Sequence, residues 1–223
     1  MSCQVLLAFA LFGPTAFAQL ANDPTAAPPP VSKHIFGIIP NFRTSETLAN
    51  YQPLTPRQKF RIASQDSFDR GTVALALIFA GQSQLSNDNR SFGQGVDGYS
   101  KYFGAAYADF VVGNFMTEGI FPTALHQDPR YFRKGTGTAL TRLGYSIGQS
   151  FWTHKDSGGM EFNYSEILGN SAAVAISNIY YRDNRTAHDA VSGLAVQVGV
   201  DTATNVMKEF WPDVSRKFAR KQH

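Results

Sequence analysis

The chain has a single cysteine, and this scarcity excludes two kinds of chemistry. Cys3 lies in an N-terminal segment that we expect to be removed, which leaves the remainder of the 223-residue chain without a thiol. The mature protein can then form no disulfide framework and use no cysteine nucleophile. We therefore expect an ordinary packed core to stabilise it.

The first 18 residues lack charged side chains and predict a cleaved signal peptide. An apolar run from Val5 to Phe12 precedes Gly13-Pro14 and the small-x-small motif Ala16-Phe17-Ala18, so the mature chain would begin at Gln19. The apolar run is about half of the ~20 residues that a membrane span needs. We therefore expect export, either to the periplasm or to an outer-membrane-associated position.

The rest of the chain lacks sustained alternation of apolar and polar residues. Apolar side chains instead recur at three- and four-residue steps, as on one face of a helix. The spacing is clearest in residues 99–114, 140–152, 164–180 and 187–210. We predict an all-α fold, a single-domain helical bundle over residues 55–215. A Pro-rich extended leader (19–54) would precede it and a basic tail (216–223) would follow.

Local signals place several boundaries of these helices. Thr55-Pro56 is typical of an N-cap followed by proline in the first helical turn, and Asn163 and Thr186 have similar capping patterns. We expect a bend at Gly71, and we expect Pro212 to end the last helix. Within the leader, residues 35–40 are apolar enough to pack against the domain as an extended strap.

The basic residues are too dispersed for a nucleic-acid interface, and the formal net charge is only +3. The excess is concentrated at the C-terminus, at Arg216, Lys217, Arg220 and Lys221. These residues favour contact with anionic lipid or another envelope polymer. They also fit a solvated tail that complements the dipole of the last helix.

The densest polar motif runs from His126 to Arg133, in the order His-Gln-Asp-Pro-Arg-Tyr-Phe-Arg. The residue before a proline is disfavoured in helical conformation, so the motif predicts a rigid corner between helices. Such a corner would suit a catalytic site of His126, Asp128 and Arg130, in which the guanidinium holds an anion. A structural salt bridge between Asp128 and a neighbouring arginine explains the same residues.

A divalent metal is a further interpretation of this region. His126 and Asp128 are two residues apart, and Glu118 lies shortly before them. Imidazole and carboxylate groups of this kind hold metals that activate water. A second His-x-Asp pair at residues 154–156 is compatible with this site, although two such pairs among five histidines are also expected by chance.

Aromatic residues close two of the predicted helices, at Tyr180-Tyr181 and at Phe210-Trp211. Tyrosine and tryptophan suit places where apolar and wet surroundings meet, so they favour a lipid-facing belt or groove. Aromatic side chains that cap a core explain them equally well. The binding residues that we predict are Arg133, Tyr131, Tyr180 and Trp211.

Several segments together resemble a family of exported proteins from acidobacteria-like soil bacteria. The segments are residues 126–133, Asn178-Ile179-Tyr180-Tyr181, Glu209-Phe210-Trp211-Pro212-Asp213, Thr55 to Phe60 and Gly93-Gln94-Gly95. The resemblance covers about residues 54 to 217. It implies export and a single domain, and it supplies no catalytic residues.

Two functions remain open from the sequence. The first is a helical envelope protein with a binding or structural role, whose partner is envelope lipid or envelope protein through peripheral membrane contact. The absence of Ser-x-x-Lys and His-Glu-x-x-His motifs favours this role over an enzyme. The alternative is a metal-assisted hydrolase of phospholipid or another envelope ester.

Overall fold

The computed structural model describes residues 32–45, 48, 51–183 and 186–220, and it is mostly helical with a few short strands. The predicted signal peptide and the proline run at 28–30 lie outside the described residues. The helical fold class is confirmed in its coarse form, because small sheets accompany the helices.

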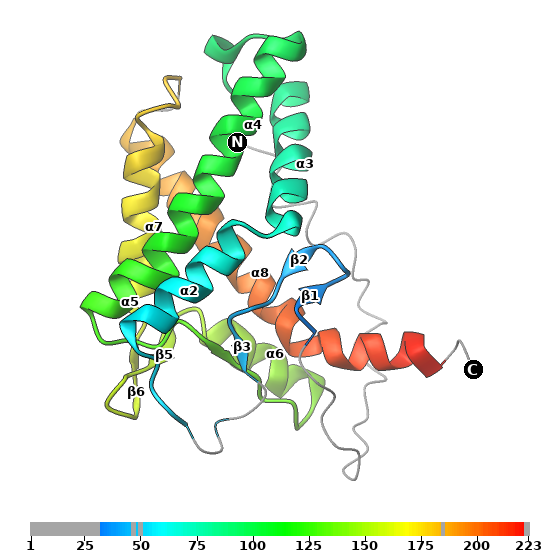
Figure 1. Cartoon of the computed structure of the whole chain (residues 1–223), viewed down its shortest axis with the longest axis vertical. Helices are drawn as coiled ribbons and strands as arrows, with labels where there is room; N and C mark the ends of the chain where they lie inside the picture. Colours follow the sequence, from blue (N-terminus) through cyan, green and yellow to red (C-terminus); the bar gives the residue numbers. More distant parts are fainter. Residues whose placement is uncertain (1–31, 46–47, 49–50, 184–185, 221–223) are drawn as a thin grey trace.

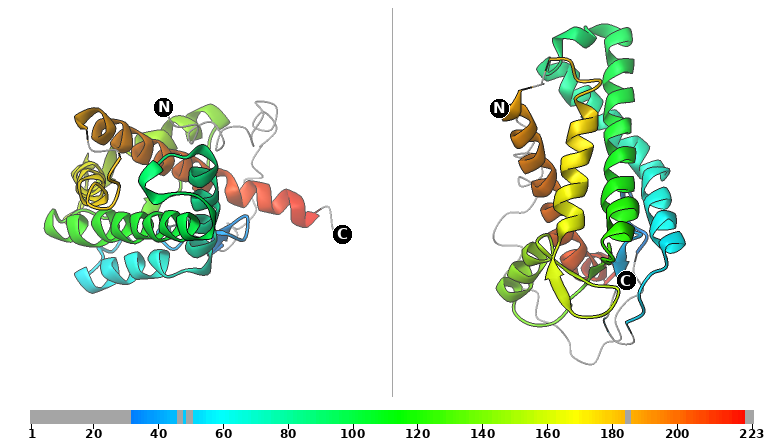
Figure 2. Two further views of the ribbon diagram at one scale, coloured as in Figure 1. Left: turned by 90° about the horizontal axis from the view of Figure 1, so that it is seen from above. Right: turned by 90° about the vertical axis from the view of Figure 1, so that its left-hand side faces the viewer.

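Long helices form an elongated bundle at one end of the molecule (Figures 1 and 2). They pack in the order α3 (Arg70–Ser86), α4 (Gly95–Asn114), α7 (Tyr164–Ser177) and the first half of α8 (Ala187–Arg220). The short helix η2 (Arg90–Phe92) lies between α3 and α4. The other end holds α2 (Pro56–Ser67), α6 (Ala139–Gly148) and the hairpin of β5 (Trp152–His154) with β6 (Met160–Phe162).

The predicted caps are present where the structure tests them. The Thr55 hydroxyl accepts a hydrogen bond from the backbone N–H of Gln58. In return, the side-chain oxygen of Gln58 accepts a hydrogen bond from the backbone N–H of Thr55. Asn163 caps α7 through the N–H of Glu166, and Thr186 exchanges bonds with Asp189 at the start of α8. The bend expected at Gly71 is a full break between α2 and α3, with Asp69 as the new N-cap.

Helix α4 does not end at its last α-helical residue. It continues through the π-helical turn η3 (Phe115–Ile120) into α5 (Phe121–Ala124). π-Helical turns are rare and frequently occur at functional positions. Here the turn buries Thr117 and Glu118. Gly169 of α7 lies so close that a Cβ there would be 2.9 Å from Cγ2 of Thr117, so the two helices are in tight contact.

The apolar strap packs against the domain as predicted, but as a hairpin. β1 (His34–Ile35) pairs with β2 (Ile39–Pro40) in antiparallel fashion, and Ile35 is completely buried. The chain then forms β3 (Thr44–Ser45), which pairs in parallel with β4 (Tyr131–Phe132). This pairing brings a segment just after the strap to the polar corner.

Gly71 is required by the strap. A Cβ at this position would lie 1.7 Å from the carbonyl oxygen of Ile38, which no small shift can relieve. We expect Gly71→Ala to lower the free energy of unfolding by about 1–3 kcal/mol, as overpacked sites do. Gly104→Ala in α4 is the matched control, because nothing lies within 4 Å of its Cβ position. Urea unfolding of both variants measures the difference, and equal effects would show that the strap does not press on α3.

Pro212 does not end α8, so this expectation is wrong. The helix continues through it to Arg220, which includes much of the segment predicted as a basic tail. Proline removes one backbone hydrogen bond, but side chains hold the helix on both sides of it. Arg142 donates to the carbonyl of Glu209, before the proline, and to the carboxylate of Asp213, after it.

The interior of the protein is polar. Among the described residues, buried polar and charged side chains outnumber buried apolar ones, and the apolar set contains mostly alanines and aromatic residues. Large apolar side chains lie on the exterior instead, such as Ile78 at 57% and Leu140 at 79% exposure. Water-exposed surface normally receives the charges, so this arrangement needs a functional explanation.

Candidate functional site

Asp128 is the centre of the polar corner, and its carboxylate is fully engaged. The residue is 1% exposed. Its Oδ1 accepts from the backbone N–H of Arg130, and the guanidinium donates to both oxygens, at 2.6 Å between Nη2 and Oδ2. The hydroxyl of Tyr51 donates to the same carboxylate at 3.0 Å. Asp128 and Arg130 therefore form a closed ion pair.

His126 does not join this pair. It is exposed and adopts a left-handed backbone conformation with a φ of 54°, whereas Asp128 is buried. Glu118 lies in η3 among other charged groups, at 3.5 Å from Arg43. No group of three His, Cys, Asp or Glu side chains in the described part of the chain is placed to hold a metal ion. The predicted metal set of His126, Asp128 and Glu118 is thus not brought together.

The second His-x-Asp pair is also divided. His154 is buried against the rings of Phe132 and Tyr51, and this burial lowers the pKa of its imidazole. Asp156 instead pairs with the buried Lys59, at 2.6 Å between Oδ2 and Nζ. Lys59 also donates to two backbone carbonyls. These contacts tie α2 to the corner and have a structural role.

The corner and the C-terminal motif meet in a second buried network. The carboxylate of Glu209 accepts from the hydroxyl of Tyr131 at 2.7 Å and from Nε of Arg142 at 2.7 Å. Arg133 and Arg142 both pair with Asp213. Tyr131 and Arg133, predicted as binding residues, therefore connect β4 to α8. Arg142, which the sequence analysis did not select, is 1% exposed at the centre of this network.

The other two predicted binding residues contact parts of the chain outside the corner motif. Trp211 packs on Phe36 of the strap, with ring centroids 4.5 Å apart. Tyr180 and Tyr181 both donate to the carboxylate of Asp109 in α4. Burial raises the pKa of Asp109 to about 6, although the two tyrosine hydrogen bonds oppose this shift. Tyr180 thus anchors the end of α7 rather than a ligand.

A third group of charged residues is buried in the middle of the molecule. It comprises Arg43, Asp66, Glu118, Glu166, Asp201 and Lys208, which come from the segment before β3 and from α2, η3, α7 and α8. We call this set the central cluster. Nη1 of Arg43 is 3.5 Å from Glu118 and 3.9 Å from Glu166. Each of these glutamates also lies near an aspartate that affects its pKa, Glu118 near Asp66 and Glu166 near Asp201.

The surroundings of the two glutamates of the central cluster favour their protonated forms. Burial, and then the neighbouring Asp66, raise the pKa of Glu118 well above its ordinary value. Burial and Asp201 likewise raise the pKa of Glu166 to about 8. Oε2 of Glu118 and Oδ1 of Asp66 are buried and find no N–H or O–H donor among the described residues. A proton on Glu118 would supply that donor, which agrees with the raised pKa of this carboxyl group.

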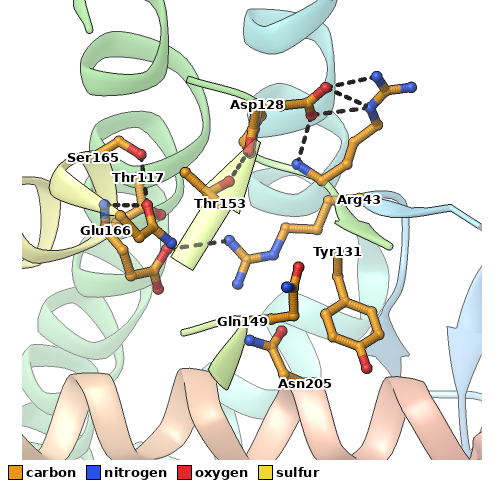
Figure 3. Close-up of a pocket in the computed structure, with 12 residues that line it drawn as sticks. Arg43, Thr117, Asp128, Tyr131, Gln149, Thr153, Ser165, Glu166 and Asn205 are labelled. Atoms are coloured by element: carbon orange, nitrogen blue, oxygen red, sulfur yellow. Dashed lines mark hydrogen bonds and ion pairs between the residues drawn. The ribbon is translucent and has the colours of Figure 1, made fainter. Parts of the chain in front are cut away.

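A small polar cavity adjoins the central cluster (Figure 3). Arg43 and Glu166 line it together with the amides of Gln149 and Asn205 and with Asp128 of the corner. The cavity has a volume of about 20 Å³, which is room for about one water molecule. A drug-sized ligand needs several hundred Å³. This cavity therefore suits hydration of buried charges better than binding of an organic substrate.

A sequence signal for the central cluster existed. Glu118, Glu166 and Asp201 are the single charges of residues 110–125, 164–177 and 190–207, which are otherwise uncharged. Their isolation marks inward-facing positions. Arg43 could not be found in this way, because only the β3–β4 pairing brings it inside.

Comparison with protein-family models, with curated proteins and with solved structures gave no match. No helix in the described residues is long and apolar enough to cross a membrane by itself.

Proposed function

We propose that this protein acts in the cell envelope after export, as a peripheral membrane protein whose helical exterior contacts lipid. The observation that supports this proposal most is that the charged side chains of several helices face the interior. Helix α3 has no charged residue after Arg70. In α6, in α7 and in residues 190–214 of α8, each charged side chain is buried or half-buried. We call the exterior of these helices the uncharged belt.

The energetics of burial support this proposal. A buried charge costs free energy unless it is paired, and an exposed charge in water costs little. A chain that folds in water alone therefore gains nothing from charges inside and leucine or isoleucine outside. In contact with lipid the preference reverses, because exposed apolar surface is then favoured and charges belong inside.

Charged residues return at the two ends of the belt. Asp88, Arg90, Asp97 and Lys101 lie around the α3–α4 connection, and Arg57, Arg61 and Lys217 lie toward the other end. An uncharged zone between charged ends is the pattern expected of a surface that dips into a membrane interface. The bundle would then lie against the membrane with part of the belt immersed.

The alternative, a metal-assisted hydrolase, has no supporting geometry within the described part of the chain. Asp128 is closed in an ion pair with Arg130, and His126 is exposed apart from it. The inner cavity is too small for a lipid ester. A non-catalytic role is the function that we propose.

A charge placed in the belt tests this function. We expect Ile78→Glu to weaken binding to phosphatidylcholine vesicles about tenfold or more, equivalent to roughly 1.4 kcal/mol, because a carboxylate resists transfer into lipid. Co-flotation in a density gradient measures the binding. Val96→Glu is the matched control, because Val96 is 89% exposed but adjoins Asp97 at the charged end. It should bind as the wild type does.

Two results would contradict the proposal. One is a wild-type protein that does not float with any vesicle. The other is an Ile78→Glu variant that converts a stable dimer to a monomer in solution without any change in flotation, which would assign the belt to a second copy of the chain. Light scattering after size-exclusion chromatography detects that case.

A further inference from the structure

Helix α2 has an outer face that differs from the uncharged belt. Arg57, Phe60, Arg61 and Phe68 are all exposed, with Phe68 at 64%. Their spacing of three, four and seven residues places them on one side of the helix and its C-cap. The opposite side carries the buried Lys59, Ala63 and Asp66. The outer face therefore combines cations with large aromatic rings.

The aromatic part of this face is a continuous cluster. Phe115 of η3 lies between Phe60 and Phe68, with ring centroids 6.4 Å from each. Phe115 is half-buried, and Ile120 nearby is 40% exposed. A cluster of this kind gains free energy when a partner removes it from water.

The cations of this face have no acidic partners in the described residues. None of the ion pairs there involves Arg57, Arg61 or Arg70. The acidic residue of α2, Asp66, points inward, and Asp69 is engaged by His34 at 3.0 Å. The face thus presents unneutralised positive charge beside exposed phenylalanine.

We propose that the outer face of α2 binds anionic lipid headgroups, with its phenylalanines inserted at the level of the acyl chains. This inference rests on the proposed function and adds the headgroup class and the edge of the protein that meets it. Arginine donates paired hydrogen bonds to phosphate oxygens, and helices that lie in a membrane interface carry basic residues beside Phe or Leu. The long arginine side chains can reach the headgroups while the rings lie deeper.

Vesicle binding with and without anionic lipid tests this assignment. We expect the full chain to bind vesicles of phosphatidylcholine mixed with phosphatidylglycerol more tightly than vesicles of phosphatidylcholine alone. The Arg57→Gln/Arg61→Gln variant should lose about 25-fold of affinity on the mixed vesicles, about fivefold per arginine, and little on the neutral ones. Added salt should weaken only the part of the binding that the variant loses.

A double variant at the other end of the molecule is the control. Arg90→Gln/Arg182→Gln removes the same charge from two exposed arginines near the α3–α4 and α7–α8 connections. It should keep the preference for anionic vesicles.

Equal losses in both double variants would show that only net charge matters and would overturn the assignment to α2. Unchanged binding of the α2 variant would overturn it too, while the proposed function would stand if the belt variant still bound neutral vesicles more weakly. If the wild-type protein bound none of the vesicles, both the proposed function and the assignment to α2 would be overturned.

Discussion

Replacing Arg142 by methionine is expected to lower the free energy of unfolding by about 3–5 kcal/mol, the usual effect of removing one partner from a buried ion pair. Arg142 is 1% exposed and binds Glu209 and Asp213 of α8 at the same time. Without it, the buried carboxylate of Glu209 retains only backbone N–H groups and the hydroxyl of Tyr131. Its charge would then lack a cationic partner among the described residues, and of the two arginines that bind α8 on both sides of Pro212 only Arg133 would remain.

Lys134→Met is the matched control for this prediction. The Lys134 side chain is exposed and lies over the ring of Tyr145, and only its backbone N–H reaches Glu209. Its replacement should change the free energy of unfolding by less than about 0.5 kcal/mol. Urea unfolding followed by circular dichroism measures both. A loss below about 1 kcal/mol for Arg142→Met would mean that the network is hydrated rather than buried.

The protein should be more stable at mildly acidic pH than at neutral pH. Glu166 has a folded-state pKa of about 8, raised by burial and by Asp201 from an ordinary 4.5. Between these values the folded state holds a proton that the unfolded state has released, so stability falls as the pH rises. Each such proton contributes about 1.4 kcal/mol per pH unit. From Glu166 alone, the expected loss from pH 5 to pH 7 is about 3 kcal/mol.

Two other groups of the central cluster also affect the pH range in which the stability falls. Glu118 acts in the same direction, because burial and Asp66 raise its pKa. Lys208 acts in the opposite direction at higher pH. Burial and then Arg43 lower its pKa from 10.5 to about 7, so the unfolded state binds the extra proton above pH 7 and stability rises there with pH. The steepest loss should therefore lie below neutrality.

Glu166→Gln isolates the contribution of one proton. Glutamine resembles the protonated glutamic acid, so the variant should match the wild type near pH 5 and exceed its stability at pH 7. Asp97→Asn is the control, because Asp97 is mostly exposed and pairs only with Lys101 on the surface. Denaturant unfolding at several pH values gives the slopes. A Glu166→Gln protein with the slope of the wild type would contradict the raised pKa of Glu166.

Much of the secondary structure could be predicted from the sequence, and for local reasons. Capping at Thr55, Asn163 and Thr186 depends on residues within one turn of each other, and all three caps are present. The expectation for Pro212 failed because its compensation is not local: Arg142 in α6 and Arg133 after β4 both bind α8 on the two sides of the proline. The strap was predicted to pack, but its hairpin form depends on the turn at Phe36-Gly37, where both residues have positive φ.

The candidate sites, too, were predicted where they depend on neighbouring residues and missed where they depend on distant ones. The sequence identified the 126–133 motif as a rigid polar corner, and the ion pair of Asp128 with Arg130 spans only two residues. The metal set failed because the chain turns at His126, which has a positive φ and is exposed, whereas Asp128 is buried. The central cluster was missed because Arg43 and Lys208 lie far apart in the chain.

The sequence by itself determined the helices, most of their ends, the rigid corner and the expectation of export, since each depends on neighbouring residues. Only the tertiary structure decided which way the charges face. The periodic pattern defines two sides of each helix, but it does not say which side meets the interior. Ion pairs between distant segments, such as Arg43 with Glu166 and Arg142 with Glu209, place the charged sides inward. The apolar sides are thereby left on the exterior, and that inversion underlies the proposed membrane role.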